Sequence, residues 1–577
     1  MDKINDEDNT ALILACDNGM KEVALELLKH PSECKMDQVD TYGSTSLIYT
    51  CMNGITEVAL ELLKYPNKCK MDQVNIYSNT ALIWACVKDM KEVALELLKY
   101  PDKCKIDQVG NMSNTALILA CDKGMTEVSL ELLKYPDRCK IDQVNTRGNT
   151  ALMRACDKGM KKIAFELLKY PDRCKIDHVS NMGNTSLMLA CDKGMIEVAL
   201  ELLKYPNRCK IDQVNTDGNT ALIFACDKGM TEVVRELLKY PDICKIDQVN
   251  THGNTVLIWA CQSQTKGVVS ELVKYPDECK LGHVNNEGNT ALILTCKNNM
   301  EKVALELLKY PSACKMDQVN THGSTALMEA CFNRMKKVAL ELLKYPDKCK
   351  IDHVNDEGNT ALIWACYKGM EKVALKLLKY PDKCKIDQVR DKGSTALMEA
   401  CDSCMTAVAL ELLKYPDECK IDQVNTYGNT ALILACKNNK NKVALKLLKY
   451  PDGCKMDHVN NEGNTALILA CKNNMTDIQK VLIQKYIDNK SSEFIKQLPN
   501  KEEILIRQKE LSDIEEKIKK LSKNSECMMC CENTTNNVFL QKCKHVLCIC
   551  SECVTKIDKR CPLCKTSTDI ITGCYVV

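Results

Sequence analysis

The chain has 577 residues, of which 45% are apolar and 27% charged, a composition typical of folded proteins rather than disordered ones. Its 79 Lys and Arg are nearly balanced by 77 Asp and Glu, which argues against a polyanion-binding surface, so no nucleic-acid partner is expected. No run approaches the ~20 apolar residues of a membrane span, and the polar start lacks a secretory apolar region. We therefore expect a cytoplasmic or nuclear protein without a membrane partner, in which reducing conditions leave the 38 cysteines without a disulfide framework.

A 35-residue repeat fills most of the chain, and we assign residues 1–489 to this array. Its marker is a threonine that follows Asn or Ser and precedes an apolar run. Fourteen copies place this threonine at Thr10, Thr45, Thr80, Thr115, Thr150, Thr185, Thr220, Thr255, Thr290, Thr325, Thr360, Thr395, Thr430 and Thr465.

Each copy predicts two short helices and a turn, as residues 148–182 illustrate. Thr150 is a suitable N-cap for a first helix, and Gly159 suits the left-handed position at its end. A second helix is predicted by one apolar stripe, and Pro171 ends it. That stripe comprises Met160, Ile163, Ala164, Leu167 and Leu168. The segment after Pro171 is predicted to be an extended hairpin in which Gly183 supplies the turn.

Such a short helix pair cannot bury its own apolar stripe, so neighbouring copies must stack into a solenoid. The sequence NTRGNTALMRACDKG (145–159) resembles the ankyrin repeat, whose signature is D-x-x-G-x-T-P-L-H-x-A-A-x-x-G. It departs from that signature at the Pro and His positions, and each copy is two residues longer. The resemblance implies a mostly α fold, an ankyrin-repeat solenoid of about 14 helix-turn-helix repeats.

The array cysteines recur once in each first helix and, in thirteen copies, once in the turn. No copy brings enough ligands together for a metal site, so we interpret these cysteines as small buried apolar residues. Histidine replaces the glutamine of KIDQV in four copies, and we expect these side chains at the surface. They are His178, His283, His353 and His458.

One position, two residues before the first-helix cysteine, varies far more than its neighbours and carries all three tryptophans. Because it accepts Trp, Arg and Glu, we expect it to face an open groove rather than a packed core. Aromatic and arginine side chains often dominate protein-binding surfaces. The predicted substrate-binding residues are Tyr49, Trp84, Arg154, Phe224, Trp259, Glu329, Trp364 and Glu399. The hairpin tips also vary, as recognition loops do, for example at Arg147 and Asp217.

Residues 490–525 form a predicted helical connector. Ile504, Leu511, Ile514, Ile518 and Leu521 follow a heptad pattern. Two interpretations remain open, a short coiled coil that makes a homodimer and a single amphipathic helix packed on the adjacent domain.

Residues 526–577 contain ten cysteines and one histidine that ignore the 35-residue period. They include three C-x2-C pairs and a C-x-H pair, spacings that suit tetrahedral Zn2+. The order of the pairs resembles the C3HC4 RING finger, which implies two zinc ions with alternating ligand pairs. One site would use Cys527, Cys530, Cys550 and Cys553. The other would use Cys543, His545, Cys561 and Cys564. Cys548 remains an alternative to Cys550, because the gap after His545 is longer than is usual in the family.

The RING resemblance also implies a partner, the ubiquitin-loaded conjugating enzyme, E2. The implied contact and activation residues are Met529, Ile557, Pro562, Leu563, Lys565 and Tyr575. The short tail resembles that of the inhibitor-of-apoptosis RING subtype, in which the tail supports a RING dimer and its aromatic residue contacts ubiquitin. No covalent catalytic residue is implied.

These features together predict a RING-type E3 ubiquitin ligase that binds its substrate on the array and positions the loaded E2 nearby. The combination resembles multi-ankyrin proteins of large DNA viruses, for which the host cytoplasm would be the site of action. The alternative is a non-catalytic ankyrin scaffold in which the zinc domain serves structure or dimerisation.

Overall fold

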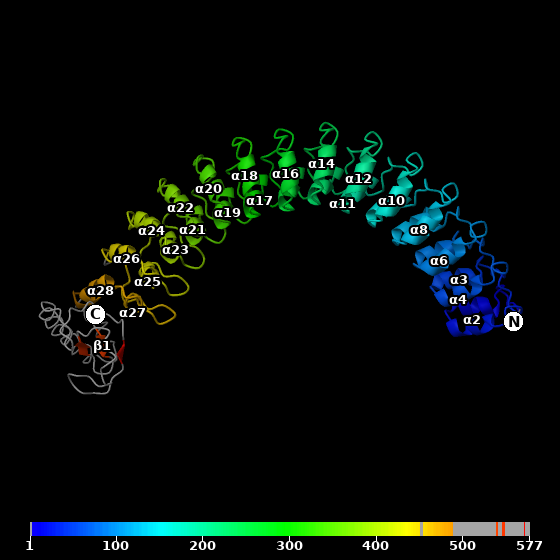
Figure 1. Cartoon of the computed structure of the whole chain (residues 1–577), viewed down its shortest axis with the longest axis horizontal. Helices are drawn as coiled ribbons and strands as arrows, with labels where there is room; N and C mark the ends of the chain where they lie inside the picture. The colour runs from blue at the N-terminus through cyan, green and yellow to red at the C-terminus, as the bar shows by residue number, and fades with distance from the viewer. Residues whose placement is uncertain (1–2, 451–453, 489–537, 541–544, 548–569, 572–577) are drawn as a thin grey trace, which may run out of the picture. The chain divides into compact units, whose positions relative to one another are not determined.

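The computed structural model describes residues 3–450, 454–488, 538–540, 545–547 and 570–571 (Figure 1). It divides into two compact units, residues 1–350 and 351–577. Consecutive helices pair within each copy, so the predicted helix-turn-helix array is confirmed.

The first unit holds ten helix pairs and a 3-10 turn, η1 (Asn111–Ser113). Its first helices are α1 (Ala11–Asp17), α3 (Ser46–Asn53), α5 (Ala81–Val87), α7 (Ala116–Asp122), α9 (Ala151–Asp157), α11 (Ser186–Asp192), α13 (Ala221–Asp227), α15 (Val256–Gln262), α17 (Ala291–Lys297) and α19 (Ala326–Phe332). Its second helices are α2 (Lys21–Leu28), α4 (Thr56–Leu63), α6 (Lys91–Leu98), α8 (Thr126–Leu133), α10 (Lys161–Leu168), α12 (Ile196–Leu203), α14 (Thr231–Leu237), α16 (Lys266–Leu272), α18 (Glu301–Leu307) and α20 (Lys336–Leu342).

The second unit holds four helix pairs and, among its described residues, three short strands. Its first helices are α21 (Ala361–Tyr367), α23 (Ala396–Asp402), α25 (Ala431–Lys437) and α27 (Ala466–Lys472). Its second helices are α22 (Glu371–Leu377), α24 (Thr406–Leu412), α26 (Asn441–Leu447) and α28 (Thr476–Asp488).

The marker threonine is the N-cap of every first helix. Its hydroxyl oxygen accepts from the backbone N–H three residues later, as Thr150 does from Met153 at 3.2 Å. This bond satisfies one of the N–H groups that a helix start leaves unpaired. Gly159 follows with φ of 67°, as predicted for a residue that ends the helix.

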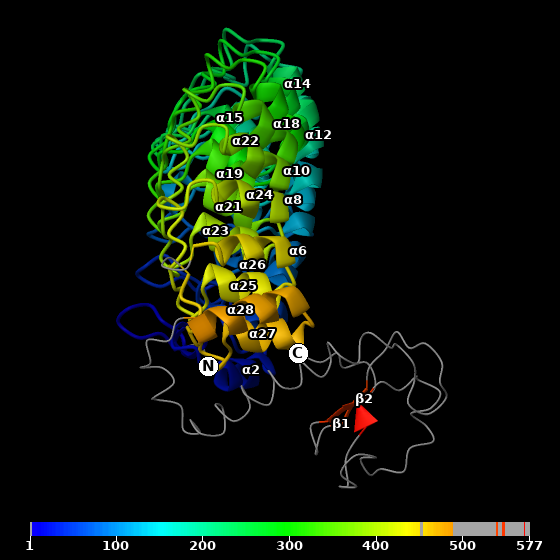
Figure 2. The same ribbon diagram turned by 90° about the vertical axis from the view of Figure 1, so that its left-hand side faces the viewer.

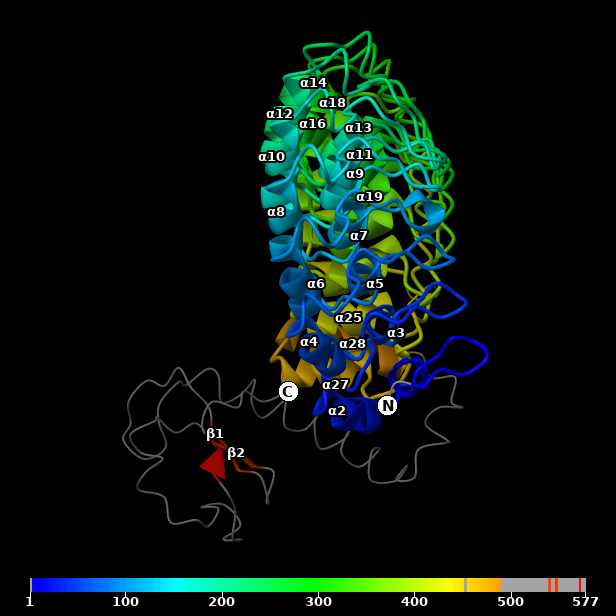
Figure 3. The same cartoon turned by 90° about the vertical axis from the view of Figure 1, so that its right-hand side faces the viewer.

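The second helix buries the predicted stripe. In α10, Ile163, Ala164, Leu167 and Leu168 are buried, and Met160 is buried as the residue before the helix. Within each unit the even-numbered helices form one layer and the odd-numbered helices another, and the hairpins project from the odd-numbered side (Figure 2, Figure 3). The core of each unit therefore lies between the two helix layers.

The segment after Pro171 differs from the extended hairpin predicted for it, because its first part is a run of turns. The backbone N–H of Cys174 donates to the carbonyl of Tyr170 at 3.0 Å, and Lys175 has φ of 49°. This compact path buries Cys174 and Ile176, which an extended strand would place farther from the helices. Gly183 does supply the predicted turn, with φ of 77°.

In several copies, a side chain near the hairpin links the copy to the one before it. Gln73 Nε2 donates to the carbonyl of Gly43 at 3.1 Å, and His283 Nε2 lies 2.9 Å from the carbonyl of Gly253. His283 thus makes the contact that glutamine makes in other copies. The four histidines expected at the surface are only partly exposed there, since all are half-buried; they are His178, His283, His353 and His458.

The described part of the array ends at Asp488, and the predicted connector, residues 490–525, lies outside the described residues. Beyond it, strands β1 (Val538–Leu540), β2 (His545–Leu547) and β3 (Ile570–Ile571) form an antiparallel sheet in the order β2-β1-β3. Phe539 in the central strand pairs with Val546 on one side and with Ile571 on the other.

Candidate functional site

The variable position falls on the fourth residue of every first helix, so the predicted substrate-binding residues recur at the same place along the array. Six of the eight are half-buried, and Tyr49 and Glu399 are buried. None of the eight is exposed, so the row they form is less open to solvent than predicted from its variation. The half-buried six are Trp84, Arg154, Phe224, Trp259, Glu329 and Trp364.

Arg154 owes its partial burial to two carboxylates. Its Nη2 lies 2.8 Å from Asp122 Oδ1, at the end of the preceding first helix, and its Nη1 lies 3.1 Å from Asp157 Oδ2. Its side chain is 18% exposed. A charge can occupy this position because it is paired, a condition under which burial costs much less.

Glu399 and Tyr49 are accommodated by partners in their own hairpins. Glu399 Oε1 lies 3.4 Å from Nη1 of Arg390, and Tyr49 donates its hydroxyl to Asp40 Oδ2 at 2.7 Å. Burial raises the pKa of Glu399, and the Arg390 guanidinium opposes that shift. Burial, together with the bond to Asp40, raises the pKa of Tyr49 well above its usual value. The side chains of Glu399 and Tyr49 therefore contribute mainly to the stability of the fold rather than to partner binding.

The tryptophans present apolar surface along the row. The indole N–H groups of Trp84 and Trp259 are buried and have no acceptor among the described residues. In the second unit, Trp364 packs edge-on against Tyr367 with ring centroids 5.8 Å apart. The Arg390 guanidinium lies over Tyr367, 5.2 Å from its ring centroid.

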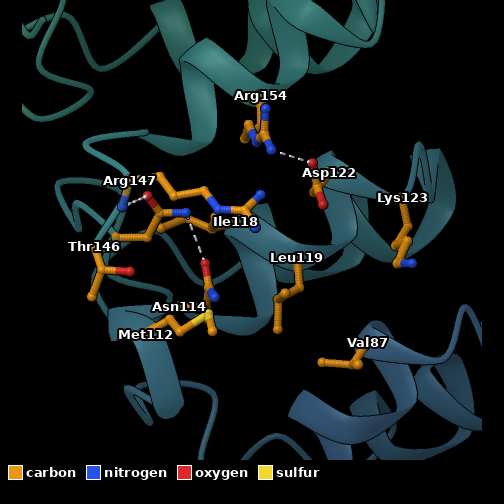
Figure 4. A pocket seen from close by; sticks show the side chains of 11 residues that line it. Val87, Met112, Asn114, Ile118, Leu119, Asp122, Lys123, Thr146, Arg147 and Arg154 are labelled. Carbon is orange, nitrogen blue, oxygen red and sulfur yellow. Dashed lines mark hydrogen bonds and ion pairs between the residues drawn. The ribbon is translucent and has the colours of Figure 1, made fainter. Parts of the chain in front are cut away.

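A pocket of about 270 Å³ opens between the first helices and the hairpins of three successive copies in the first unit (Figure 4). Row residues Leu119 and Arg154 line it, so it brings part of the predicted row together with the hairpin tips. The other lining residues are Val87, Met112, Asn114, Ile118, Asp122, Lys123, Asn145, Thr146 and Arg147.

The polar rim of this pocket has two components. Asn145 Nδ2 donates to Asn114 Oδ1 at 2.9 Å, so these amides hold neighbouring hairpins together. Lys123 and Arg147 are exposed and have no carboxylate partner within the described ranges. In Figure 4 they lie on opposite sides of Leu119. Variation at the hairpin tips indicated Arg147 as a binding residue. The sequence carried no such signal for Lys123, because most copies carry Lys or Asn at that position.

The array cysteines are buried as predicted, except at Cys471 and at Cys404, which is additional to the two repeated cysteine positions. Burial raises the pKa of Cys51 and of Cys436 to about 12, so these thiols are unreactive in the folded chain. In the described ranges no group of three or more His, Cys, Asp or Glu side chains is arranged to hold a metal ion.

The predicted zinc ligands and E2-contact residues lie outside the described residues, except that His545 begins β2 and its side chain is not described. Their roles remain predictions. Within the part of the chain that the structure does describe, no helix has the length and apolar character needed to cross a membrane.

Comparison with known families identifies the array directly. A family model for ankyrin repeats, spanning three copies at a time, matches residues 1–75, 84–180, 117–213, 187–281, 277–352, 347–424 and 405–493. These ranges include every helix from α1 to α28 at least in part. No curated protein matches the chain.

Proposed function

Because the chain belongs to the ankyrin-repeat family, we propose that it is a protein-binding scaffold whose partner docks along the row of first helices and hairpin tips. This proposal rests on the positions at which the copies differ. The framework of threonine caps, buried leucines and cysteines recurs in copy after copy, while one row alternates among Leu, Trp, Phe, Tyr, Arg and Glu. Variation on a constant framework is what selective recognition requires.

The test replaces tryptophans of the row with the residue that six other copies carry there, which is leucine. Trp84→Leu combined with Trp259→Leu keeps an apolar side chain that the framework already accommodates. The matched control is Phe165→Leu, which changes a half-buried aromatic residue in the second-helix layer.

The full-length parent, the double tryptophan variant and Phe165→Leu each serve as bait in quantitative cross-linking and mass spectrometry. We expect a set of proteins to be enriched on the parent and on Phe165→Leu but reduced several-fold on the double variant, because buried aromatic residues dominate protein interfaces. Equal recovery on all three baits would exclude docking along the row in the first unit.

A second candidate function is that of a RING-type ubiquitin ligase, which the cysteine and histidine spacing of residues 527–564 supports. The donor set suits two structural zinc sites, one with four thiolates and one with three thiolates and an imidazole. The three-stranded antiparallel sheet that includes His545 adds to that support. Bound zinc would supply the fold of this short segment, because few large apolar residues are present to stabilise it.

In this function the array holds the substrate, and the C-terminal domain holds the ubiquitin-loaded E2 close to it. Met529, Ile557, Pro562 and Leu563 would contact the E2. Lys565 would hold ubiquitin against it, as the RING resemblance implies, with Tyr575 contributing from a dimer partner.

An in vitro ubiquitination assay with a panel of E2 enzymes tests the ligase. We expect chain formation by the parent, and its loss in Met529→Ala and Lys565→Ala at unchanged zinc content. If the parent forms no chains with any E2 while the capture experiment still identifies row-dependent partners, the protein is a scaffold without ligase activity. Zinc content measured for Cys548→Ser and Cys550→Ser decides between the two alternative ligands.

A further inference from the structure

We propose that the pocket between α5, α7 and α9 binds an acidic segment of the partner protein that carries one apolar anchor side chain. This inference rests on the proposed scaffold function and adds the chemistry of the partner. It is carried by the size of the pocket, its lining and the unpaired charge on its rim (Figure 4).

The size and lining of the pocket suit a side chain. Its volume of about 270 Å³ is at the lower end of the range of ligand pockets, which begins at roughly 300 Å³. Val87, Met112, Ile118 and Leu119 supply apolar surface, and Met112 is 55% exposed at the hairpin tip. Burying an aliphatic or aromatic anchor against them contributes about 1.5–3 kcal/mol per side chain.

The rim carries net positive charge. Asp122 and Asp157 are engaged by Arg154, and Asp157 also lies 3.8 Å from Lys193 Nζ, so both carboxylates already have cationic partners in the chain. Asn114 and Asn145 bond to each other. The charges left for a ligand are those of Lys123 and Arg147, both exposed and without a carboxylate partner in the described ranges. Carboxylates that flank the anchor would meet these two cations, and arginine binds a carboxylate with two parallel hydrogen bonds.

Comparison among the copies shows that, within the first unit, a cation at the hairpin tip is particular to one copy. At the hairpin position of Arg147, the other copies of the first unit carry Glu, Tyr, Met, Asp or His. Arg154 is the only arginine of the row, and it belongs to the same copy as Arg147. Several other copies carry a carboxylate at the tip, for example Asp217 and Glu287. An acidic partner would therefore favour this pocket over the equivalent place in those copies.

The probes are short fluorescent peptides of three kinds, tested by polarisation with the full-length chain. One kind has a central Leu or Phe between Asp and Glu residues, one has the same centre between Lys residues, and one has a central Ser between Asp and Glu residues. We expect the acidic peptides with an apolar centre to bind most tightly, and added salt to weaken that binding.

Two variants use residues that other copies already carry at the same positions. Arg147→Met adopts the residue of Met112 and Met182, and Lys123→Asn adopts the residue of Asn298. We expect each to weaken the acidic peptide by about tenfold, the typical effect of removing a charged hydrogen-bond partner. The matched control Lys392→Met removes a cation from the same hairpin position of another copy and should leave the affinity unchanged.

The proposal is overturned if the lysine-flanked peptides bind as tightly as the acidic ones, if no acidic peptide binds, or if Arg147→Met has no more effect than Lys392→Met. Failure of the scaffold function is separate, because it shows as equal protein capture by the parent and by the double tryptophan variant. Row-dependent capture that Arg147→Met leaves intact would keep the scaffold and exclude the acidic segment at this pocket.

Discussion

Asn215 donates from its side-chain Nδ2 to Oδ1 of Asn184, in the preceding copy, at 3.0 Å. Its Oδ1 accepts from the backbone N–H groups of Asp217 and Asn219 at 3.0 and 2.9 Å. One buried side chain thus shapes its own hairpin and ties it to its neighbour. The same amide pair links Asn145 to Asn114, Asn250 to Asn219, Asn285 to Asn254, Asn320 to Asn289 and Asn460 to Asn429.

This ladder predicts that Asn215→Ala lowers the free energy of unfolding by about 1–3 kcal/mol, because two partly buried backbone N–H groups lose their acceptor. Asn215→Asp should cost less, since its carboxylate still accepts from both, as Asp40 does in the second copy. Urea denaturation followed by circular dichroism measures both. The exposed Asn207→Ala is the control and should change stability by less than about 0.5 kcal/mol. Equal effects of all three substitutions would show that the ladder does not stabilise the array.

The two glycines of the sixth copy predict a second contrast. Gly183 has φ of 77°, and a Cβ there would lie 2.8 Å from the Cα of Asn215. Gly194 has φ of 65°, and a Cβ there would meet no atom within 4 Å. Alanine pays a cost of about 1–2 kcal/mol for the left-handed conformation at both sites.

Gly183→Ala should therefore destabilise the chain by about 1–3 kcal/mol more than Gly194→Ala, because only at Gly183 must the neighbouring backbone move. Thermal denaturation of the two variants side by side measures the difference. Equal melting temperatures would mean that the hairpins separate at no cost to the fold.

Much of the fold could be predicted because fourteen copies of one pattern can be compared within the chain. Thr150, Gly159 and Leu167 each stand at a position where local chemistry decides the structure, a cap, a left-handed turn or a buried stripe. The turn after Pro171 could not be predicted in this way. Its path depends on Lys175 in a left-handed conformation, which lysine itself does not favour, and on burial of Cys174 and Ile176.

The row could be located from the sequence because its residues differ between copies. The environment of those residues could not be predicted in this way. From the sequence, Arg and Glu at this position were expected to lie open to solvent. Arg154 instead pairs with Asp122, 32 residues earlier in the chain, and Glu399 pairs with Arg390. Such pairings depend on how neighbouring copies and hairpins pack, which periodicity alone does not specify.

The environment of Glu399 predicts an unusual pH dependence. Burial raises its pKa in the folded chain above the ordinary value, so the folded state binds this proton more tightly than the unfolded state does. The contribution of Glu399 to stability is therefore present at low pH and is lost as the pH rises through the ordinary value toward the raised one.

Relative to Glu399→Gln, the parent should consequently gain stability as the pH falls from neutral toward about 4, the range in which carboxyl groups titrate. Urea midpoints of both proteins at several pH values measure this trend, and the exposed Glu418→Gln compared with the parent is the control. A difference in stability between parent and Glu399→Gln that is independent of pH, or that changes in the opposite direction, would contradict the raised pKa of Glu399.

Two cysteines of one copy predict a difference in reactivity. Cys401 is buried in α23, and burial raises its thiol pKa well above the ordinary value. Cys404 is exposed three residues later, at a left-handed position with φ of 63°. Because the thiolate is the nucleophile, iodoacetamide should label Cys404 at least about a hundredfold faster than Cys401 in the folded chain. Peptide mapping by mass spectrometry resolves the two sites, and labelling in denaturant should make their rates equal. Comparable rates in the folded chain would mean that α23 opens on the timescale of the reaction, contrary to its burial.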